Sequence, residues 1–329
     1  MKERITLKEG EGTQASYNLI KDFFLKKLNN PFLEPLNDAS YLKEKWVFSC
    51  DSFTVKPIFF PSSDIGKLSI CGTINDLVVS GAFPLYLSLA IIVEEGFLKK
   101  DLERIVNSIR EVCLEENVKI VSGDFKVVEK DKIDKIFIST AGLGKRISKN
   151  SASSFKKIKN KDKIILTGSI AEHGISVMLA RKKIFDFNIK SDCQSLKKTL
   201  IPLWKNFGSI RFMRDPTRGG LAAILNEIWL GTGLGIKVFE EKIPLKEEVK
   251  NACEILGIDP YYLACEGRAV IVVDKTEAKK VLFFLKKGSP QAQIIGETNE
   301  KLKGVVLETV AGGRRILDFS HSFNLPRIC

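Results

Sequence analysis

Residues 77–93 read LVVSGAFPLYLSLAIIV, the longest stretch of the chain without a charged side chain. Gly81 and Pro84 interrupt this stretch, and both residue types are unfavourable inside a helix. It is also shorter than the roughly 20 apolar residues that a membrane helix needs. The stretch therefore predicts the end of a buried helix, a turn and a buried strand, and no membrane span.

Strands and helices alternate around this stretch. Apolar alternation and β-branched content predict strands at residues 45–53, 84–93, 119–128 and 135–143. Helices are expected at residues 73–80 and 100–117, the second with one apolar face. This order indicates an α/β domain.

A second α/β segment follows a Ser-, Lys- and Asn-rich linker at residues 145–163. Its expected strands are 163–170, 269–273 and 303–310, and its expected helices are 174–182, one after DPTRGG (215–220), and 275–286. The last stretch has no helical period. We therefore expect domains at 1–147 and 148–310, and a mobile tail at 311–329 that ends in Cys329.

Composition excludes several classes of protein. The net charge is +12, but the 52 basic residues are spread among 40 acidic ones, and no basic stretch is interleaved with aromatics as in single-strand nucleic-acid binders. The first twelve residues, MKERITLKEGEG, lack the apolar core of a signal peptide. The seven cysteines include no C-x-x-C pair, which fits neither a zinc site nor a disulfide framework. We expect a cytoplasmic protein with no nucleic-acid or membrane partner.

Four aspartates of the first domain are candidate metal ligands. Each is expected at a strand end or a helix start, where an aspartate is usually a turn former or a cap: Asp38, Asp51, Asp76 and Asp124. Four in one domain favour a cluster. Because the chain has only two histidines, an oxygen-loving cation such as Mg²⁺ is the natural candidate, and it would hold the phosphates of a nucleotide.

Other residues admit both a functional and a structural interpretation. Lys126 shares a strand face with Asp124, and would either stabilise an anion or form a plain ion pair. Asp215 and Pro216 predict a helix start, where Arg218 and Gly219 suit an anion. Glu266 precedes a buried strand, either as a desolvated proton acceptor or as a solvated turn residue. His173 either contacts phosphate or is structural. Cys329 is an incidental surface thiol, the end of a strand, or a thiol on a mobile tail that carries a chemical group.

Six stretches together resemble the HypE family of hydrogenase maturation factors. They are GTINDLVVSGA (72–82), SGDFKVVEK (122–130), RDPTRGGLA (214–222), CEGR (265–268), AGGRRILD (311–318) and the terminal PRIC (326–329), which is the most specific. The family belongs to the ATP-binding superfamily of aminoimidazole ribonucleotide synthase, selenophosphate synthetase and thiamine-monophosphate kinase. The resemblance implies a two-domain fold and a homodimer whose N-terminal domains form a β-barrel, with ATP and Mg²⁺ in a cleft between the domains.

The implied activity is that of a lyase. The carbamoyltransferase HypF loads the terminal cysteine, an ATP-dependent dehydration converts the S-carboxamide into a thiocyanate, and the cyanide passes to iron on the HypC–HypD complex during [NiFe]-hydrogenase assembly. A small-molecule kinase or synthetase of the same superfamily is the alternative enzyme, and a scaffold with a binding thiol is the non-enzymatic one. Deleting Cys329 would separate the two enzymes.

The resemblance also implies roles for individual residues. Asp38, Asp51 and Asp76 would bind Mg²⁺–ATP, with further nucleotide contacts from Asp124, Asp215, Arg218 and Gly219. Lys126 would contact the carboxamide or phosphoryl group, Glu266 would act as the base or relay to it, and Cys329 would be the acceptor. Arg314, Arg315 and Arg327 would dock the tail. Two stretches depart from the family pattern: LKEGEGTQAS (7–16) replaces a His-Gly-rich loop, and LNDAS (36–40) carries Asn37 in place of an acid.

Overall fold

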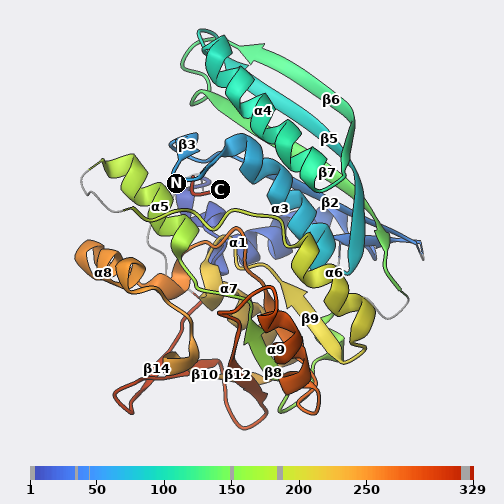
Figure 1. The fold of residues 1–329 in the computed structure, drawn as a ribbon, viewed down its shortest axis with the longest axis vertical. Coiled ribbons are helices and arrows are strands. Elements are labelled where there is room, and N and C mark those ends of the chain that lie inside the picture. Colours follow the sequence, from blue (N-terminus) through green and yellow to red (C-terminus); the bar gives the residue numbers. More distant parts are fainter. Residues whose placement is uncertain (1–3, 34–35, 44, 149–151, 184–187, 320–326) are drawn as a thin grey trace.

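The computed structural model describes residues 4–33, 36–43, 45–148, 152–183, 188–319 and 327–329. Two sheets lie in the two halves of the molecule, and Figure 1 shows the first above the second. Residues 149–151 of the expected linker and 320–326 of the expected tail fall outside the described residues.

The first sheet has five strands. Their order across the sheet is β1 (Ser40–Leu42), β2 (Trp46–Phe53), β7 (Ile136–Arg146), β5 (Ala82–Glu94) and β6 (Lys119–Val128). β5 and β6 run parallel, because α4 (Lys99–Glu115) connects them as a crossover. α3 (Ile65–Val79) packs against β2, β5 and β7 and against α4, so the helices lie on one face of this sheet.

α3 begins at a cap that the sequence analysis did not identify. Asp64 accepts hydrogen bonds from the amides of Gly66 and Lys67 at 2.8 and 3.0 Å. Thirteen of the fifteen helix residues are buried, so α3 has no polar stripe and its first two turns carry no helical period. The helix therefore starts eight residues before the expected residue 73.

The second sheet has seven strands. Their order is β14 (Arg314–Ile316), β13 (Val305–Glu308), β10 (Gly235–Phe239), β12 (Gln293–Asn299), β8 (Lys163–Leu166), β11 (Val270–Val273) and β9 (Ile210–Arg214). The helices of this half are α5 (Glu172–Lys182), α6 (Lys197–Asn206), α7 (Gly220–Thr232), α8 (Glu247–Leu256) and α9 (Ala278–Lys286). β8 and β11 are buried almost throughout, as expected for central strands covered on both faces.

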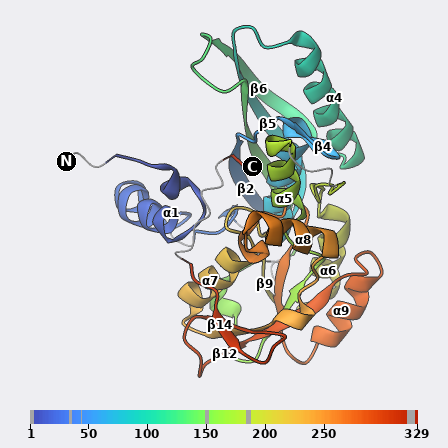
Figure 2. The ribbon, with the colours of Figure 1, turned by 90° about the vertical axis from the view of Figure 1, so that its left-hand side faces the viewer.

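Short elements complete the described chain. The N-terminal segment contains η1 (Leu7–Gly10), α1 (Gln14–Leu19), η2 (Ile20–Leu25) and α2 (Lys26–Leu28), and Figure 2 shows α1 standing beside the body of the molecule. β3 (Phe59–Phe60) and β4 (Ser63–Asp64) form a hairpin, and single turns of helix lie at η3 (Phe155–Lys157), η4 (Glu240–Lys242) and η5 (Pro260–Tyr262). Among the described residues, no helix has the length and apolar character needed to cross a membrane.

One expectation for the second half was wrong. Asp215 does not cap a helix: α7 begins at Gly220, and Asp215 to Gly219 form the loop between β9 and α7. In the described parts of the tail, β14 joins the edge of the second sheet with exposed side chains, and Ile328 is only 6% exposed. The last residues of the tail therefore have a docked position in the structure.

Candidate functional site

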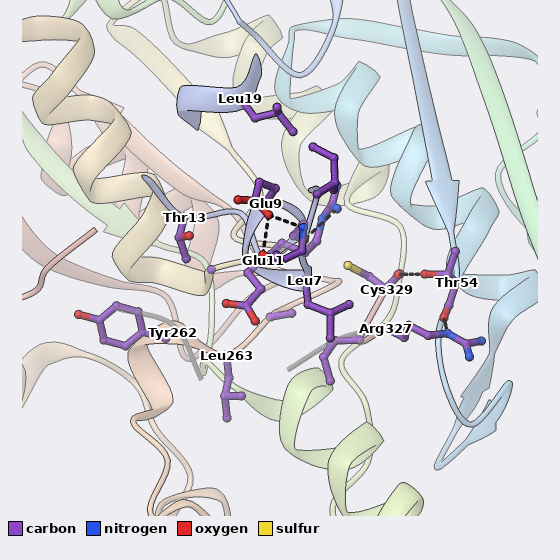
Figure 3. A pocket seen from close by; sticks show the side chains of 17 residues that line it. Leu7, Glu9, Glu11, Thr13, Leu19, Thr54, Tyr262, Leu263, Arg327 and Cys329 are labelled. Atoms are coloured by element: carbon purple, nitrogen blue, oxygen red, sulfur yellow. Dashed lines mark hydrogen bonds between the residues drawn. The ribbon is translucent and has the colours of Figure 1, made fainter. Parts of the chain in front are cut away.

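The last three residues run beside the segment that follows β2. The amide of Thr54 donates to the carbonyl of Cys329 at 3.3 Å, and the amide of Lys56 donates to the carbonyl of Arg327 at 3.0 Å. The Arg327 guanidinium donates from Nε to the Thr54 carbonyl at 2.6 Å (Figure 3). It also pairs with Asp134. The end of the chain thus extends the first domain by strand-like pairing.

The second half of the molecule holds the same three residues from the other side. Arg181 donates to the Arg327 carbonyl at 2.8 Å, and His173 Nε2 donates to the Ile328 carbonyl at 2.9 Å. Because Nε2 faces a carbonyl it carries the proton, so His173 Nδ1 accepts from the Ser191 hydroxyl at 2.8 Å. Burial lowers the pKa of His173 to about 4, so the ring is neutral. His173 therefore has a structural role here, in holding the tail.

The Cys329 thiol lies in a buried, acidic environment. Burial raises its pKa well above the usual value, and the charge of Glu266 and a hydrogen bond with its side chain raise it further, while Arg218 opposes them. A thiol in this position is protonated at neutral pH and is a poor nucleophile. The docked position therefore does not suit loading of the thiol, but it suits chemistry on a group that the sulfur already carries.

Glu266 lies in the turn before β11 and is 1% exposed. Burial raises its pKa well above the usual value, with Cys193, Asp215, Asp51 and Asp192 as further causes. Among the described residues its Oε1 has no hydrogen-bond partner. A carboxyl with a raised pKa and a free oxygen can exchange a proton near neutral pH.

Three carboxylates converge beside this position. Oxygens of Asp38, Asp76 and Asp215 lie within 4.8 Å of one another. They come from the residues before β1, from the last turn of α3 and from the loop after β9. Arg214 Nε pairs with Asp38 at 2.8 Å, and the Ser49 hydroxyl donates to Asp76 at 2.5 Å.

The electrostatics of these carboxylates fit a cation. Burial raises the pKa of Asp76 and of Asp215 well above the usual value, and the neighbouring acids raise it further. Asp215 Oδ2 is buried without a hydrogen-bond partner in the described part of the chain. Buried oxygen donors that repel one another are suited to a hard cation such as Mg²⁺.

The close group differs from the predicted metal ligands at one residue. Asp51 lies inside β2 and not at its end, and it does not belong to the close group of three. It lies near enough to raise the pKa of Asp76 and Glu266. Asp215, which was expected only to contact the nucleotide, is the third member of the group. The expectation that Asp76 starts a helix was also wrong, because it lies in the last turn of α3.

Asp124 and Lys126 are not brought to this group within the subunit. Both lie inside β6, where their side chains are 59% and 63% exposed, and they pair with each other at 2.6 Å. Lys126 is the one charged residue among the causes that lower the pKa of Asp124. Asp124 was therefore wrongly placed at a strand end, and the expected ion pair is present.

A cavity of about 350 Å³ opens beside Cys329. Its walls include the N-terminal residues 5–13, Arg218, Gly219 and residues 262–264. Gly219 has φ +77°, and a Cβ there would lie 2.8 Å from the Gly12 carbonyl, so only glycine allows the N-terminal loop to pack this closely. Sequence analysis missed other residues around the site: Thr54, Asn75, Asp134, Arg181, Asp192 and Arg268. Of these, Asn75 and Arg268 lie inside the motifs GTINDLVVSGA and CEGR, whereas the others have no local signal.

Comparison with known proteins gives matches over almost the whole chain. Residues 37–145 match the family model of the AIR synthase related protein N-terminal domain, and residues 159–307 match that of the C-terminal domain. The carbamoyl dehydratase HypE of Rhizobium leguminosarum bv. viciae is 42% identical over 99% of this chain and 95% of its own length. A solved HypE–HypF complex contains a chain 45% identical with TM-score 0.88, covering 91% of this chain and 99% of that one. A HypE structure in complex with ATP is 39% identical with TM-score 0.84, covering 99% of this chain and all of that one.

Proposed function

The chain belongs to the HypE family of hydrogenase maturation proteins, and we propose that it is an ATP-dependent carbamoyl dehydratase, a lyase that acts on its own Cys329. The observation that carries this proposal is the position of the C-terminal thiol, which is partly buried beside Glu266 and Asp51, while Glu266 in turn lies near Asp215. An enzyme for a free small molecule has no need of a thiol there. A small-molecule kinase or synthetase is therefore not favoured.

The reaction follows from the groups around the sulfur. ATP phosphorylates the oxygen of the S-carboxamide, which then leaves as phosphate while the two N–H protons are removed and the S–C≡N group forms. The carboxamide and ATP thus give the thiocyanate, ADP and phosphate. The oxygen that the carboxamide loses ends in the released phosphate. Glu266 would take a proton in this step or relay it, because its carboxyl lies beside the thiol and its Oε1 has no hydrogen-bond partner among the described residues.

The nucleotide would lie between the aspartates and the loop before α7. Asp38, Asp76 and Asp215 would hold Mg²⁺, with Asp51 as a further contact, and the metal would neutralise phosphate charge. Arg218 and Gly219 directly precede α7. The charged side chain of Arg218 and the backbone amides of both residues would therefore contact the phosphates.

Three partners are proposed, together with a cytoplasmic location. HypF would load Cys329 after the tail has left its buried position, and the HypC–HypD complex would accept the cyanide. The third partner is a second copy of the chain. In the described residues, α3 and α4 cover one face of the first sheet, while Trp46, Phe48, Tyr86 and Ile92 of the same sheet remain 37–42% exposed. A barrel with a partner's sheet would cover these side chains, and would let Asp124 and Lys126 reach the partner's site.

Mass spectrometry of the intact protein tests the activity. After incubation with HypF, carbamoyl phosphate, ATP and Mg²⁺, we expect one carbamoyl group on Cys329. The carbamoylated protein should then lose one water only when ATP is present for its own dehydration reaction. Cys329→Ala is the control and should acquire no carbamoyl group. An unmodified Cys329 beside a transferase that is active on another HypE would contradict the proposal, and turnover of a small molecule by Cys329→Ala would favour the kinase.

A further inference from the structure

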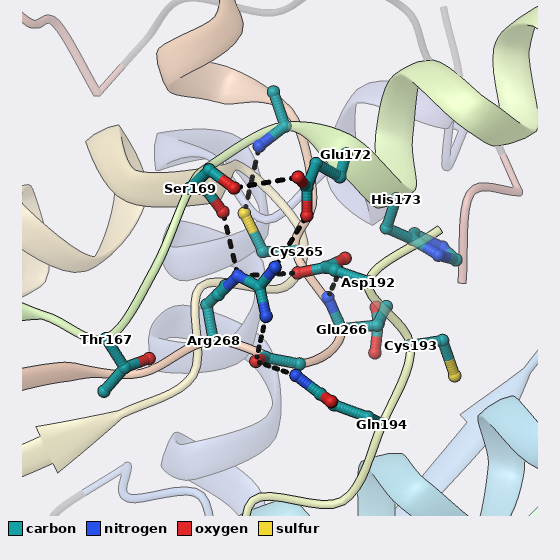
Figure 4. A network of polar contacts seen from close by, with 12 residues as sticks. Thr167, Ser169, Glu172, His173, Asp192, Cys193, Gln194, Cys265, Glu266 and Arg268 are labelled. Atoms are coloured by element: carbon teal, nitrogen blue, oxygen red, sulfur yellow. Dashed lines mark hydrogen bonds and ion pairs between the residues drawn. The ribbon is translucent and has the colours of Figure 1, made fainter. Parts of the chain in front are cut away.

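A buried network of charged side chains lies directly behind Glu266 (Figure 4). Arg268 donates to Glu172 at 2.6 Å and to the carbonyl of Ser169 at 2.9 Å, and Lys246 pairs with Glu172 at 2.5 Å. Asp192 Oδ2 lies 3.6 Å from Arg268 Nε, and the Asp192 side chain is fully buried. Arg268 and Lys246 together therefore balance the two buried carboxylates of Glu172 and Asp192, which is the condition under which such charges are tolerated.

Asp192 connects this network to the backbone of Glu266. Its Oδ1 accepts a hydrogen bond from the Glu266 amide at 3.1 Å. The Glu266 carbonyl accepts from the amide of Gln194 at 3.3 Å and from Asn75 Nδ2 at 3.3 Å. Both backbone groups of Glu266 are thus held, whereas its carboxyl keeps Oε1 without a partner in the described structure.

The next residue is fixed in the same way. The Gly267 carbonyl accepts from Arg268 at 3.0 Å and from Gln194 Nε2 at 3.3 Å. A Cβ on Gly267 would lie 2.0 Å from the Asp192 carbonyl, so the two backbones are in direct contact. The turn that carries Glu266 is therefore built against residues 192–194 and cannot shift alone.

We propose that Asp192 is a positioning residue for the dehydration: its Oδ1 holds the Glu266 amide so that the Glu266 carboxyl is directed at the group on Cys329. This inference rests on the proposed function. Arg268 supports the arrangement by balancing the charge of Asp192. A misplacement of the reacting carboxyl by about 1 Å can cost roughly a hundredfold in rate, so loss of this contact should slow the reaction.

Two substitutions separate the position of the oxygen from the charge. Asp192→Asn keeps an acceptor at Oδ1 and loses the charge, whereas Asp192→Glu keeps the charge and displaces the acceptor. The experiment follows water loss from Cys329 in the full chain, carbamoylated beforehand by HypF, over a range of ATP concentrations. We expect D192N to react within about threefold of the wild-type rate at saturating ATP, and D192E to react roughly ten- to a hundredfold more slowly. The half-saturating ATP concentration should stay unchanged in both.

The control is a buried aspartate of the same kind elsewhere in the second half. Asp162 Oδ2 accepts a hydrogen bond from the backbone amide of Lys159 at 2.7 Å and lies 3.6 Å from Arg211 Nε. The Asp162 side chain is 3% exposed. Asp162→Glu should leave the rate of water loss unchanged at temperatures where both variants are folded. A fast D192E with a slow D192N would overturn the inference, as would equal slowing by D162E. If wild-type protein loads but never loses water, the proposed function itself fails.

Discussion

His173 shows how one buried side chain links stability to pH. Its ring is fully buried and its pKa is lowered to about 4, whereas an unfolded chain protonates histidine near 6.5. The stability that the neutral ring contributes is complete above pH 6.5 and is lost as the pH falls toward 4. We expect this to remove up to about 3 kcal/mol from the free energy of unfolding. Urea denaturation at pH 7 and pH 4.5 measures it.

The control for this prediction is His173→Gln, which cannot titrate in this range. The buried acids with raised pKa change stability in the opposite direction, but they act equally in both proteins, so the difference between the two pH profiles isolates the histidine. Profiles that run parallel from pH 7 to 4.5 would contradict the assignment of a neutral, buried ring.

For single residues, the sequence predicted which side chains lie in the site better than it predicted which residues they contact. Asp76, Glu266 and Cys329 belong to motifs with apolar neighbours that imply burial, and all three lie around one position. The presence of Asp215 and not Asp51 in the close group was not predictable, because it depends on how the loop after β9 meets α3. Asp192 carries no local signal, since its function depends on contact with Glu266, 74 positions away along the chain.

Among the elements, the first sheet was predicted well and helix starts were predicted poorly. The observed β6 has the predicted bounds, because the stretch is rich in β-branched residues, which favour strands. α7 starts five residues after Asp215, because Gly219 and Gly220 both have positive φ and continue the loop. The sequence of an Asp-Pro pair is thus consistent with a helix cap. Whether a helix begins there depends on the backbone conformation of the residues that follow.

The uncovered face of the first sheet gives a prediction for assembly. Phe48 on β2 is 42% exposed, and burial of such a side chain against a second copy would contribute about 1–2 kcal/mol. We expect the wild-type chain to be a dimer, and Phe48→Glu to be a folded monomer at micromolar concentration, because the change places a charge inside the barrel. Size-exclusion chromatography with light scattering measures the mass. Leu114→Glu, at a position 66% exposed on α4, should remain a dimer, and a dimeric F48E would show that the interface lies elsewhere.

For the whole molecule, the tail connects the two halves, which we propose to divide near residue 147. Thr54 and Asp134 belong to the first half, His173 and Arg181 to the second, and all four hold residues 327–329. The sequence predicted that Cys329 ends a tail, but not where the tail lies, because its contact from Arg327 to Thr54 joins residues 273 positions apart. The proposed loading by HypF, followed by dehydration in the docked position, would require two positions of this tail.

Arg327→Ala should shift the tail toward the released position. The change removes the hydrogen bond to the Thr54 carbonyl and the ion pair with Asp134, and charged hydrogen bonds of this kind contribute about 1.5–3 kcal/mol each. We expect alkylation of Cys329 by iodoacetamide, followed by peptide mass spectrometry, to become at least about tenfold faster, and ATP-dependent water loss from the loaded thiol to slow. Arg314→Ala is the matched control, because Arg314 lies in the same tail but pairs only at the surface, with Glu308 at 3.5 Å. Faster alkylation with unchanged water loss would mean that the reaction does not need the docked tail, and unchanged alkylation would mean that Arg327 does not hold it.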